Sequence, residues 1–152
     1  MKYLVIDGSN LVRKIYGFSP VEARKERYRG DTANSSAFVS VLKRFIKRCP
    51  KFTKFNSRLN SAVEVHFDGK PRDIFEAGVG KLTCICSGYS SSDDMIIRRI
   101  SALPSRDRRQ VLLLTFDREL AANARKLSAH VINPDSLIEM VERHGLSLHS
   151  FA

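Results

Sequence analysis

Cysteine is scarce in this chain. Its 152 residues include three, Cys49, Cys84 and Cys86. So small and odd a number does not fit a disulfide framework, and the spacing does not match the paired cysteines of a zinc knuckle. We therefore expect reduced cysteines and a cytoplasmic protein, because intracellular compartments keep thiols reduced.

Long hydrophobic runs are also lacking. Asp7 interrupts the first apolar run, which argues against a signal peptide. No later run approaches the ~18 consecutive apolar residues that a membrane helix needs. Hydrophobic residues make up 43% of the chain and charged residues 28%. This composition is typical of a globular protein, and the length predicts a single domain spanning residues 1–152, with no membrane partner.

Acidic residues are outnumbered by basic ones. Sixteen Asp and Glu face 26 Lys and Arg, which gives a net charge of +10 and a pI near 9.9. A field of that sign attracts polyanions, and nucleic acid is the usual partner of so basic a small domain. The alternative is that the charge only keeps the protein in solution.

What the chain does have is an alternation of short apolar runs and amphipathic helical patterns. One helical stripe is formed by Phe38, Val41, Leu42, Phe45 and Ile46. The runs are rich in Val, Ile, Leu and Phe, which indicates strands of a parallel sheet that is buried on both faces. We therefore predict an α/β three-layer sandwich, with a central, mainly parallel sheet and helices on both faces. The predicted strands are Lys2–Ile6, Ala62–Phe67, Leu82–Cys86, Val111–Thr115 and His130–Ile132.

Carboxylates follow four of these five strands. Asp7 and Asp68 come directly after the first two, Asp117 lies just beyond the fourth, and Asp93 and Asp94 begin the helix after the third. In an open parallel sheet the carboxyl ends of the strands share one edge, where ligands bind. Each acid alone could be a helix cap or part of a turn, but crowded carboxylates repel one another. A hard cation removes that repulsion, so the convergence predicts a Mg²⁺ or Mn²⁺ site.

Asn10 has two alternative roles. It could cap the helix predicted over Leu11–Tyr16. It could instead lie one turn from Asp7 and orient a water or a ligand without adding negative charge.

At these positions the chain resembles the NYN branch of the PIN-like nucleases, and within it the YacP-like proteins. The order and spacing agree along essentially the whole chain, although Phe116 stands where that family commonly has serine. That ring could pack inward or could alter access to the site. The matching segments are "YLVIDGSN", "VEVHFDG", "SSSDDMI", "LLLTFDREL" and "NPDSLIEMVE".

The resemblance implies a PIN-like (Rossmann-like) fold and a Mg²⁺- or Mn²⁺-dependent ribonuclease, expected to be an endonuclease, that leaves a 5′-phosphate and a 3′-hydroxyl. Its implied catalytic residues are Asp7, Asn10, Asp68, Asp93 and Asp117. Its implied metal ligands are Asp7, Asp93 and Asp117, with Asp94 as an alternative or additional ligand. RNA is the expected partner, DNA stays open, and a ribosome or RNA-processing assembly could present the substrate. The candidates for phosphate contacts are Lys70, Arg72, Arg98, Arg99 and Arg118.

Other function classes fit less well. Ser9 occupies the place of the second aspartate of a haloacid-dehalogenase-type phosphotransferase, and the single glycine of "DGSN" is too few for a dinucleotide-binding turn. The remaining rival is a non-catalytic RNA-binding module that keeps the fold and acts in a larger RNA-processing or translation-linked assembly.

Overall fold

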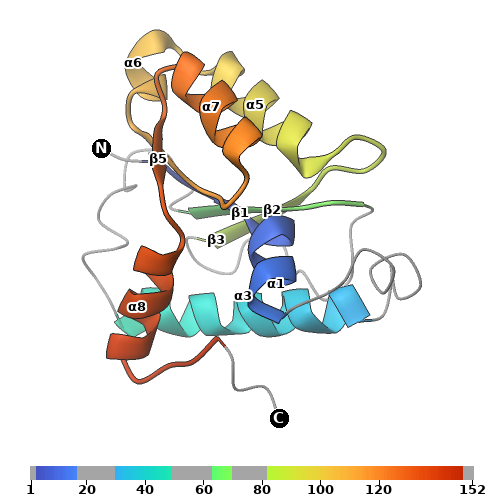
Figure 1. Cartoon of the computed structure of the whole chain (residues 1–152), viewed down its shortest axis with the longest axis vertical. Helices are drawn as coiled ribbons and strands as arrows, with labels where there is room; N and C mark the ends of the chain where they lie inside the picture. The colour runs from blue at the N-terminus through green and yellow to red at the C-terminus, as the bar shows by residue number, and fades with distance from the viewer. Residues whose placement is uncertain (1–2, 17–29, 49–62, 70–81, 149–152) are drawn as a thin grey trace.

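The structure is a computed structural model that describes residues 3–16, 30–48, 63–69 and 82–148. In this part of the chain, five parallel strands form one sheet between two layers of helices (Figure 1). The strand order is β3-β2-β1-β4-β5. The strands are β1 (Tyr3–Asp7), β2 (Val63–Phe67), β3 (Leu82–Cys86), β4 (Val111–Leu114) and β5 (His130–Ile132).

Helices cover both faces of the sheet, which confirms the predicted fold class (Figure 1). On one side lie α1 (Gly8–Tyr16), α3 (Gly30–Arg48) and α8 (Asp135–Arg143). On the other side lie α5 (Ser92–Ala102), α6 (Ser105–Arg108) and α7 (Arg118–Lys126). None of the helices in the described ranges is long and apolar enough to span a membrane.

The predicted strands agree with the observed ones, with small shifts at their ends. Asp7 is the last residue of β1 rather than the first residue after it, and Thr115 lies just beyond β4. Lys2 and Ala62, two predicted strand starts, lie outside the described residues. These shifts leave the side-chain alternation along each strand unchanged.

That alternation divides the interior into two cores. Leu4 and Ile6 of β1 point into the large core, which packs against α1, α3 and α8 and contains three fully buried phenylalanines, Phe38, Phe45 and Phe67. Val5 points the other way, into the small core. The small core comprises Val5, Ile96, Ile100, Val111, Leu113, Leu120, Ala124 and Ala129, beneath α5 and α7.

The helix ends show which local signals decide a boundary. The Asn133-Pro134 pair is a helix start signal in which Asn133 would be the cap and Pro134 the first helical residue. Helix α8 begins one residue later, at Asp135, but the Asn133 side chain still accepts a hydrogen bond from the Asp135 N–H at 2.9 Å. The predicted capping role of Asn10 is wrong, because α1 begins at Gly8 and Asn10 lies within its first turn.

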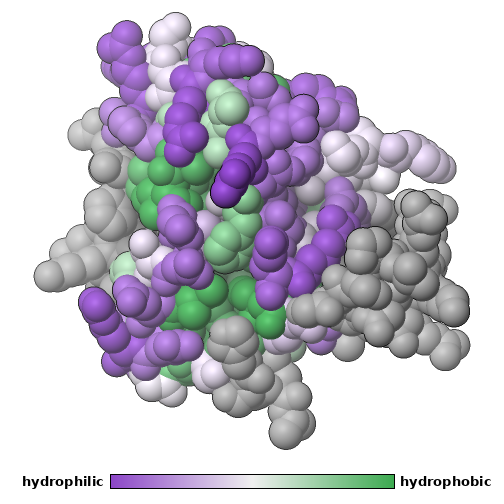
Figure 2. Space-filling view, in the orientation of Figure 1, coloured by the Kyte–Doolittle hydropathy of each residue, from purple (hydrophilic) through white to green (hydrophobic). Residues whose placement is uncertain are grey.

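The surface on the face seen in Figure 2 is mostly hydrophilic. Polar and charged residues cover the layer of α5, α6 and α7, and apolar patches emerge beside β5 and lower, toward α8 and α1.

Candidate functional site

The order of the strands reverses between β1 and β4. The chain runs outward from β1 through β2 to β3, then crosses over to β4 and β5 on the other side. A sheet of this kind has its ligand crevice at the carboxyl ends of the two strands that flank the reversal. Asp7 ends β1, and Thr115 and Asp117 follow β4, so three of the polar residues at this edge lie at the switch point.

Asp7 is a buried carboxylate, with 1% of its surface exposed. Its pKa is raised to about 7, mainly by burial and additionally by the charges of Asp93 and Asp68. Hydrogen bonds from the Thr115 hydroxyl and the Asn10 backbone oppose it. The Oδ1 atom of Asp7 has no hydrogen-bond partner among the described residues. An acceptor buried without a donor is costly, so this oxygen is suited to a ligand that supplies positive charge or a proton.

Thr115 connects Asp7 to Asp117. Its hydroxyl donates to Asp7 Oδ2 at 2.8 Å and accepts from the Asp117 N–H at 3.0 Å. The Asp117 carboxylate in turn caps α7, accepting from the N–H groups of Glu119 and Leu120 at 2.9 and 3.1 Å. The capping explanation of Asp117 is therefore confirmed, although the cap uses one of its two oxygens, Oδ1.

Asn10 faces the same crevice from α1. Its Oδ1 accepts from the Phe116 N–H at 2.8 Å, so the side-chain amide ties α1 to the segment that follows β4. Because the oxygen is occupied, the NH₂ group is the end of the amide that remains to donate a hydrogen bond. The Phe116 ring packs against the large core, so the inward-packing alternative for this residue holds.

Asp93 and Asp94 have different surroundings. Burial, followed by the charges of the neighbouring carboxylates of Asp117, Asp68 and Asp94, raises the pKa of Asp93 to about 6. Asp94 is exposed, and its backbone N–H donates to the Ser91 hydroxyl that caps α5. Asp93 is thus the member of the pair whose pKa is raised by the other acids of the site.

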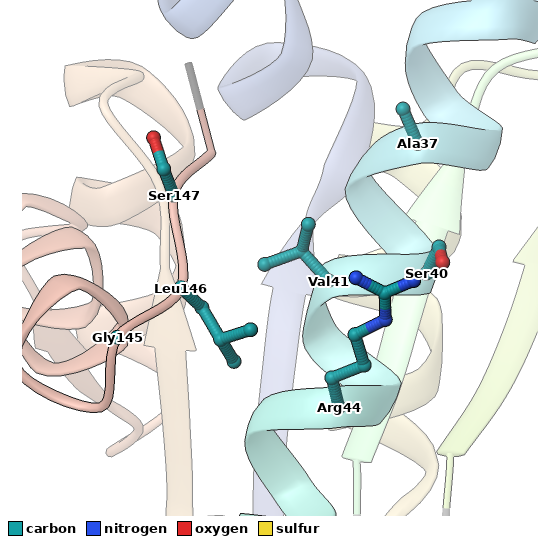
Figure 3. Close-up of a pocket in the computed structure, with 7 residues that line it drawn as sticks. All are labelled: Ala37, Ser40, Val41, Arg44, Gly145, Leu146 and Ser147. Atoms are coloured by element: carbon teal, nitrogen blue, oxygen red, sulfur yellow. The ribbon is translucent and has the colours of Figure 1, made fainter. Parts of the chain in front are cut away.

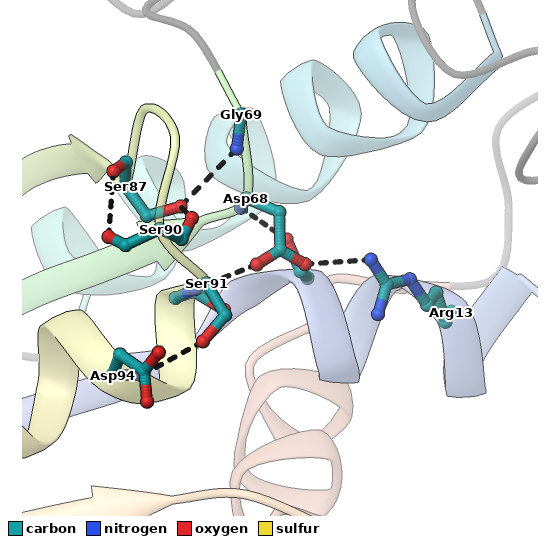
Figure 4. A network of polar contacts seen from close by, with 9 residues as sticks. Arg13, Asp68, Gly69, Ser87, Ser90, Ser91 and Asp94 are labelled. Carbon is teal, nitrogen blue, oxygen red and sulfur yellow. Dashed lines mark hydrogen bonds and ion pairs between the residues drawn. The ribbon is translucent and has the colours of Figure 1, made fainter.

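Asp68 is engaged in a network that Figure 4 shows. One oxygen accepts from the Ser92 N–H at 2.7 Å, and the other pairs with the Arg13 guanidinium at 2.7 Å. Burial alone would raise the pKa of Asp68, but these two contacts outweigh it and hold the pKa below its ordinary value. The Asp68 N–H also donates to the Ser9 hydroxyl at 2.8 Å. Asp68 therefore ties α1 to the start of α5.

Gly8, which follows Asp7, lies where α1 approaches β2 too closely for a larger residue. A Cβ atom at this position would lie 2.7 Å from Phe67 Cε1 and 2.8 Å from the His66 carbonyl oxygen. Because the backbone of β2 cannot move aside, only glycine lets α1 begin this close to the sheet. The residue therefore determines where Asn10 and Arg13 lie relative to the acids.

The donor set of this site fits a hard divalent cation. Asp7, Asp68, Asp93 and Asp117 influence one another electrostatically, and one buried oxygen of Asp7 is unsatisfied. The described residues contain no preformed group of three His, Cys, Asp or Glu side chains arranged as a complete ligand set. Mg²⁺ typically retains several waters and uses one or two carboxylates, so this partial set matches its preference.

The predicted RNA-contacting residues are not all in equivalent positions. Lys70 and Arg72 lie outside the described residues. Arg98 and Arg118 are exposed on α5 and α7, and Arg118 directly follows Asp117. Arg99 is half-exposed, but its guanidinium pairs with Glu64 of β2.

Glu64 and His66 are buried polar residues that the sequence analysis missed. Both lie on the small-core face of β2, where His66 is in register with Asp7 of β1. Burial alone would raise the pKa of Glu64, but neighbouring His66 and Arg99 outweigh it and lower the pKa. The alternation of "VEVHF" was the available signal, since it places two polar residues on one strand face.

A shallow hollow of about 400 Å³ lies elsewhere, between α3 and the segment after α8 (Figure 3). None of the acids of the site lines it. Its lining residues are Ala37, Ser40, Val41, Arg44, Gly145, Leu146 and Ser147.

Comparison with known proteins supports the fold. No family model matches the sequence, and no curated protein does. The crystal structure of Rae1 (YacP) from Bacillus subtilis, a W164L mutant, superposes with a TM-score of 0.60 at 19% sequence identity. The match covers 95% of this chain and 77% of that one. A likeness at this identity establishes a shared fold, and it agrees with the YacP-like resemblance of the motifs.

Proposed function

We propose that this protein is a metal-dependent ribonuclease that hydrolyses RNA phosphodiester bonds at the site formed by Asp7, Asp93 and Asp117. The observation that carries the proposal is the buried Asp7 carboxylate, which has an unsatisfied oxygen and lies among other acids at the switch point of the sheet. A structural carboxylate at such a depth would normally have a full set of donors.

Asp7, Asp93 and Asp117 would hold the ion, with Asp94 as a further candidate at its periphery. A bound Mg²⁺ or Mn²⁺ would polarise the scissile phosphate and make water a stronger nucleophile at neutral pH. The water oxygen forms a bond to phosphorus while the bond to the 3′-oxygen breaks. The 3′-oxygen takes up a proton, which leaves a 3′-hydroxyl and a 5′-phosphate.

The protein groups around the ion have supporting roles. The Thr115 hydroxyl fixes the rotamer of Asp7 through its 2.8 Å hydrogen bond. The Oδ1 atom of Asn10 is occupied by the Phe116 N–H, which leaves its side-chain NH₂ group as a neutral donor. Asp68 fixes the start of α5, and with it the position of Asp93, through the Ser92 N–H.

The positive charge of the chain supports RNA as the polyanionic partner. The resemblance favours an endonucleolytic cut, and the few cysteines favour a cytoplasmic location. Arg98 and Arg118 are the described candidates for contacts to phosphate. Arg99 is a weaker candidate, since contact with phosphate would compete with its pairing to Glu64.

The second candidate is a non-catalytic RNA-binding module in a larger RNA-processing or translation-linked assembly. It is favoured by the lack of a preformed three-ligand group in the described ranges and by the engagement of Asp68 and Asp117 in structural hydrogen bonds. In that case the acids would hold the ends of the helices together, and the basic surface alone would bind RNA.

One experiment separates the two functions. Labelled single-stranded RNA is incubated with the protein in Mg²⁺, in Mn²⁺ and in EDTA, and the products are resolved on a gel. The parent is compared with Asp7→Asn, and with Asp135→Asn as a matched control, since Asp135 is an exposed acid in the first turn of α8.

The nuclease proposal expects cleavage that requires metal, is lost in Asp7→Asn by at least about 100-fold, and persists in Asp135→Asn. Binding of RNA without cleavage by any of the three proteins would contradict it and favour the non-catalytic module.

A further inference from the structure

Tyr89 is the only large hydrophobic side chain in the described part of the chain that is fully exposed. It lies in the loop between β3 and α5, four residues before Asp93. A tyrosine in this loop, which is rich in glycine and serine, could be a partly buried anchor of the loop or a platform on which a base stacks. Its complete exposure rules out the anchor.

The turn that carries Tyr89 is closed by hydrogen bonds on both sides of it. The Ser87 hydroxyl donates to the Ser90 carbonyl at 2.6 Å, and the Ser90 hydroxyl donates to the Ser87 carbonyl at 3.0 Å (Figure 4). Gly88 has a φ of +67°, a left-handed conformation that glycine adopts at little cost. Such a closed turn presents the ring in a restricted set of positions, so contact with a partner would cost little additional backbone entropy.

The same turn is attached to the acid site. The Gly88 N–H donates to the Gly69 carbonyl at 2.8 Å, and the Gly69 N–H donates to the Ser87 hydroxyl at 3.3 Å. Gly69 directly follows Asp68, whose carboxylate accepts from the Ser92 N–H (Figure 4). Four residues span at most about 14 Å, so Tyr89 lies close to Asp93 even if the intervening chain is extended.

We propose that Tyr89 stacks against an unpaired base of the nucleic acid strand whose backbone enters the acid site. This inference rests on the proposed function for the identity of the strand. The chain carries a net charge of +10, which favours a polyanionic strand. Exposed aromatic rings are a feature of proteins that bind single strands, where stacking tolerates any base because every base has a π face. The ring would position the strand without selecting its sequence.

The chain offers a specific reporter for this contact, because it contains no tryptophan. Tyr89→Trp places a single indole at the proposed platform. Its fluorescence is titrated with a single-stranded RNA oligonucleotide in EDTA, which prevents cleavage. Ser136→Trp, at an exposed position of α8, is the matched control.

The proposal expects saturable quenching in Tyr89→Trp and little change in Ser136→Trp. Because the ring accepts any base, the strand can shift to present a neighbouring base, so abasic sites added one after another along the oligonucleotide should lower the quenching stepwise and abolish it when every base has been removed. Quenching that is equal in the two variants, or that survives the removal of every base, would overturn the proposal.

Affinity gives a second measurement. Tyr89→Ala should weaken RNA binding about tenfold, whereas Tyr89→Phe should stay within about twofold of the parent. Thermal stability should not change in either variant, because the side chain is fully exposed. Equal RNA affinity in Tyr89→Ala and the parent would contradict base stacking. The exposed ring would then be better explained by contact with a protein partner.

These readouts are independent of catalysis. If RNA is bound but never cleaved, the nuclease proposal fails while quenching and the abasic series still support Tyr89. If RNA is cleaved and Tyr89→Ala binds and cleaves as the parent does, the stacking proposal fails and the nuclease proposal stands.

Discussion

The two faces of the sheet differ in what they bury. The large core, under α1, α3 and α8, is apolar and includes three fully buried phenylalanines. The face under α5 and α7 has a smaller apolar cluster and also buries Glu64, His66 and Asp7. Buried polar groups cost stability unless they are paired. One face therefore supplies most of the hydrophobic stabilisation, and the other carries the buried ionisable side chains.

The comparison of the faces can be tested with one change made on each. Leu42→Ala in the large core should lower the free energy of unfolding by about 3–5 kcal/mol, and Leu120→Ala in the small core by about 2–3 kcal/mol. Both leucines are buried, but the small core lies beside polar groups and helix ends that can relax. Urea unfolding measures both. A larger loss for Leu120→Ala would show that the small core contributes more to stability than the large core.

Gly8→Ala tests the close approach between α1 and β2. The new Cβ would overlap backbone and side-chain atoms of β2, so we expect a loss of about 2–3 kcal/mol, measured by thermal unfolding. Gly88→Ala is the control, because a Cβ there meets nothing within 4 Å and costs only the left-handed strain of about 1 kcal/mol. Equal losses would show that overlap at α1 is relieved by a small shift.

The pairing of Arg99 with Glu64 tests the polar face. Arg99→Met leaves a buried carboxylate without its charged partner and should destabilise the fold by roughly 1–3 kcal/mol, a range reduced because Arg99 is half-exposed. The double variant Glu64→Met/Arg99→Met should recover most of that loss. Arg98→Met, on the exposed side of α5, is the control and should change stability by less than about 0.5 kcal/mol. No recovery in the double variant would show that Arg99 acts through packing.

An effect of similar size is expected in the pH dependence of stability. The folded pKa of Asp7 is about 7 and its ordinary value is 3.8, so its favourable contribution is present below about pH 4 and is lost as the pH rises through 7. In EDTA, Asp7→Asn should therefore unfold less readily than the parent at pH 8, by roughly 1–3 kcal/mol, with little difference at pH 4. Saturating Mg²⁺ or Mn²⁺ should reduce the gap. A gap that does not change with pH would show that the carboxylate stays charged or protonated throughout.

The fold was largely predictable from the sequence, since strands buried on both faces and helices with one apolar stripe leave strong local patterns. Leu82–Cys86 and His130–Ile132 agree to the residue, and the stripe from Phe38 to Ile46 lies on α3. Helix starts were less predictable, because a cap depends on a hydrogen bond that a neighbouring strand can take over. Asn10 is an example, since its oxygen bonds to Phe116, 106 residues away.

The positions of the acids in the fold were predictable, but their burial and hydrogen-bond partners were not. Their place after the strands follows from the parallel order of the sheet, whereas their hydrogen-bond partners come from remote parts of the chain. Asp68 is engaged by Arg13, 55 residues away, while one oxygen of Asp7 remains unsatisfied among the described residues. The roles of Thr115 and Glu64 were missed for the same reason.

The sequence by itself determined the layered α/β architecture, the positive charge and the edge of the sheet to which the carboxylates belong. These properties depend on composition and on side-chain periodicity along single segments. Only the tertiary structure decided which carboxylates are buried, which are neutralised by a partner, and that Tyr89 faces solvent. Burial and charge interactions depend on distances through space, which separate segments create only when they pack together.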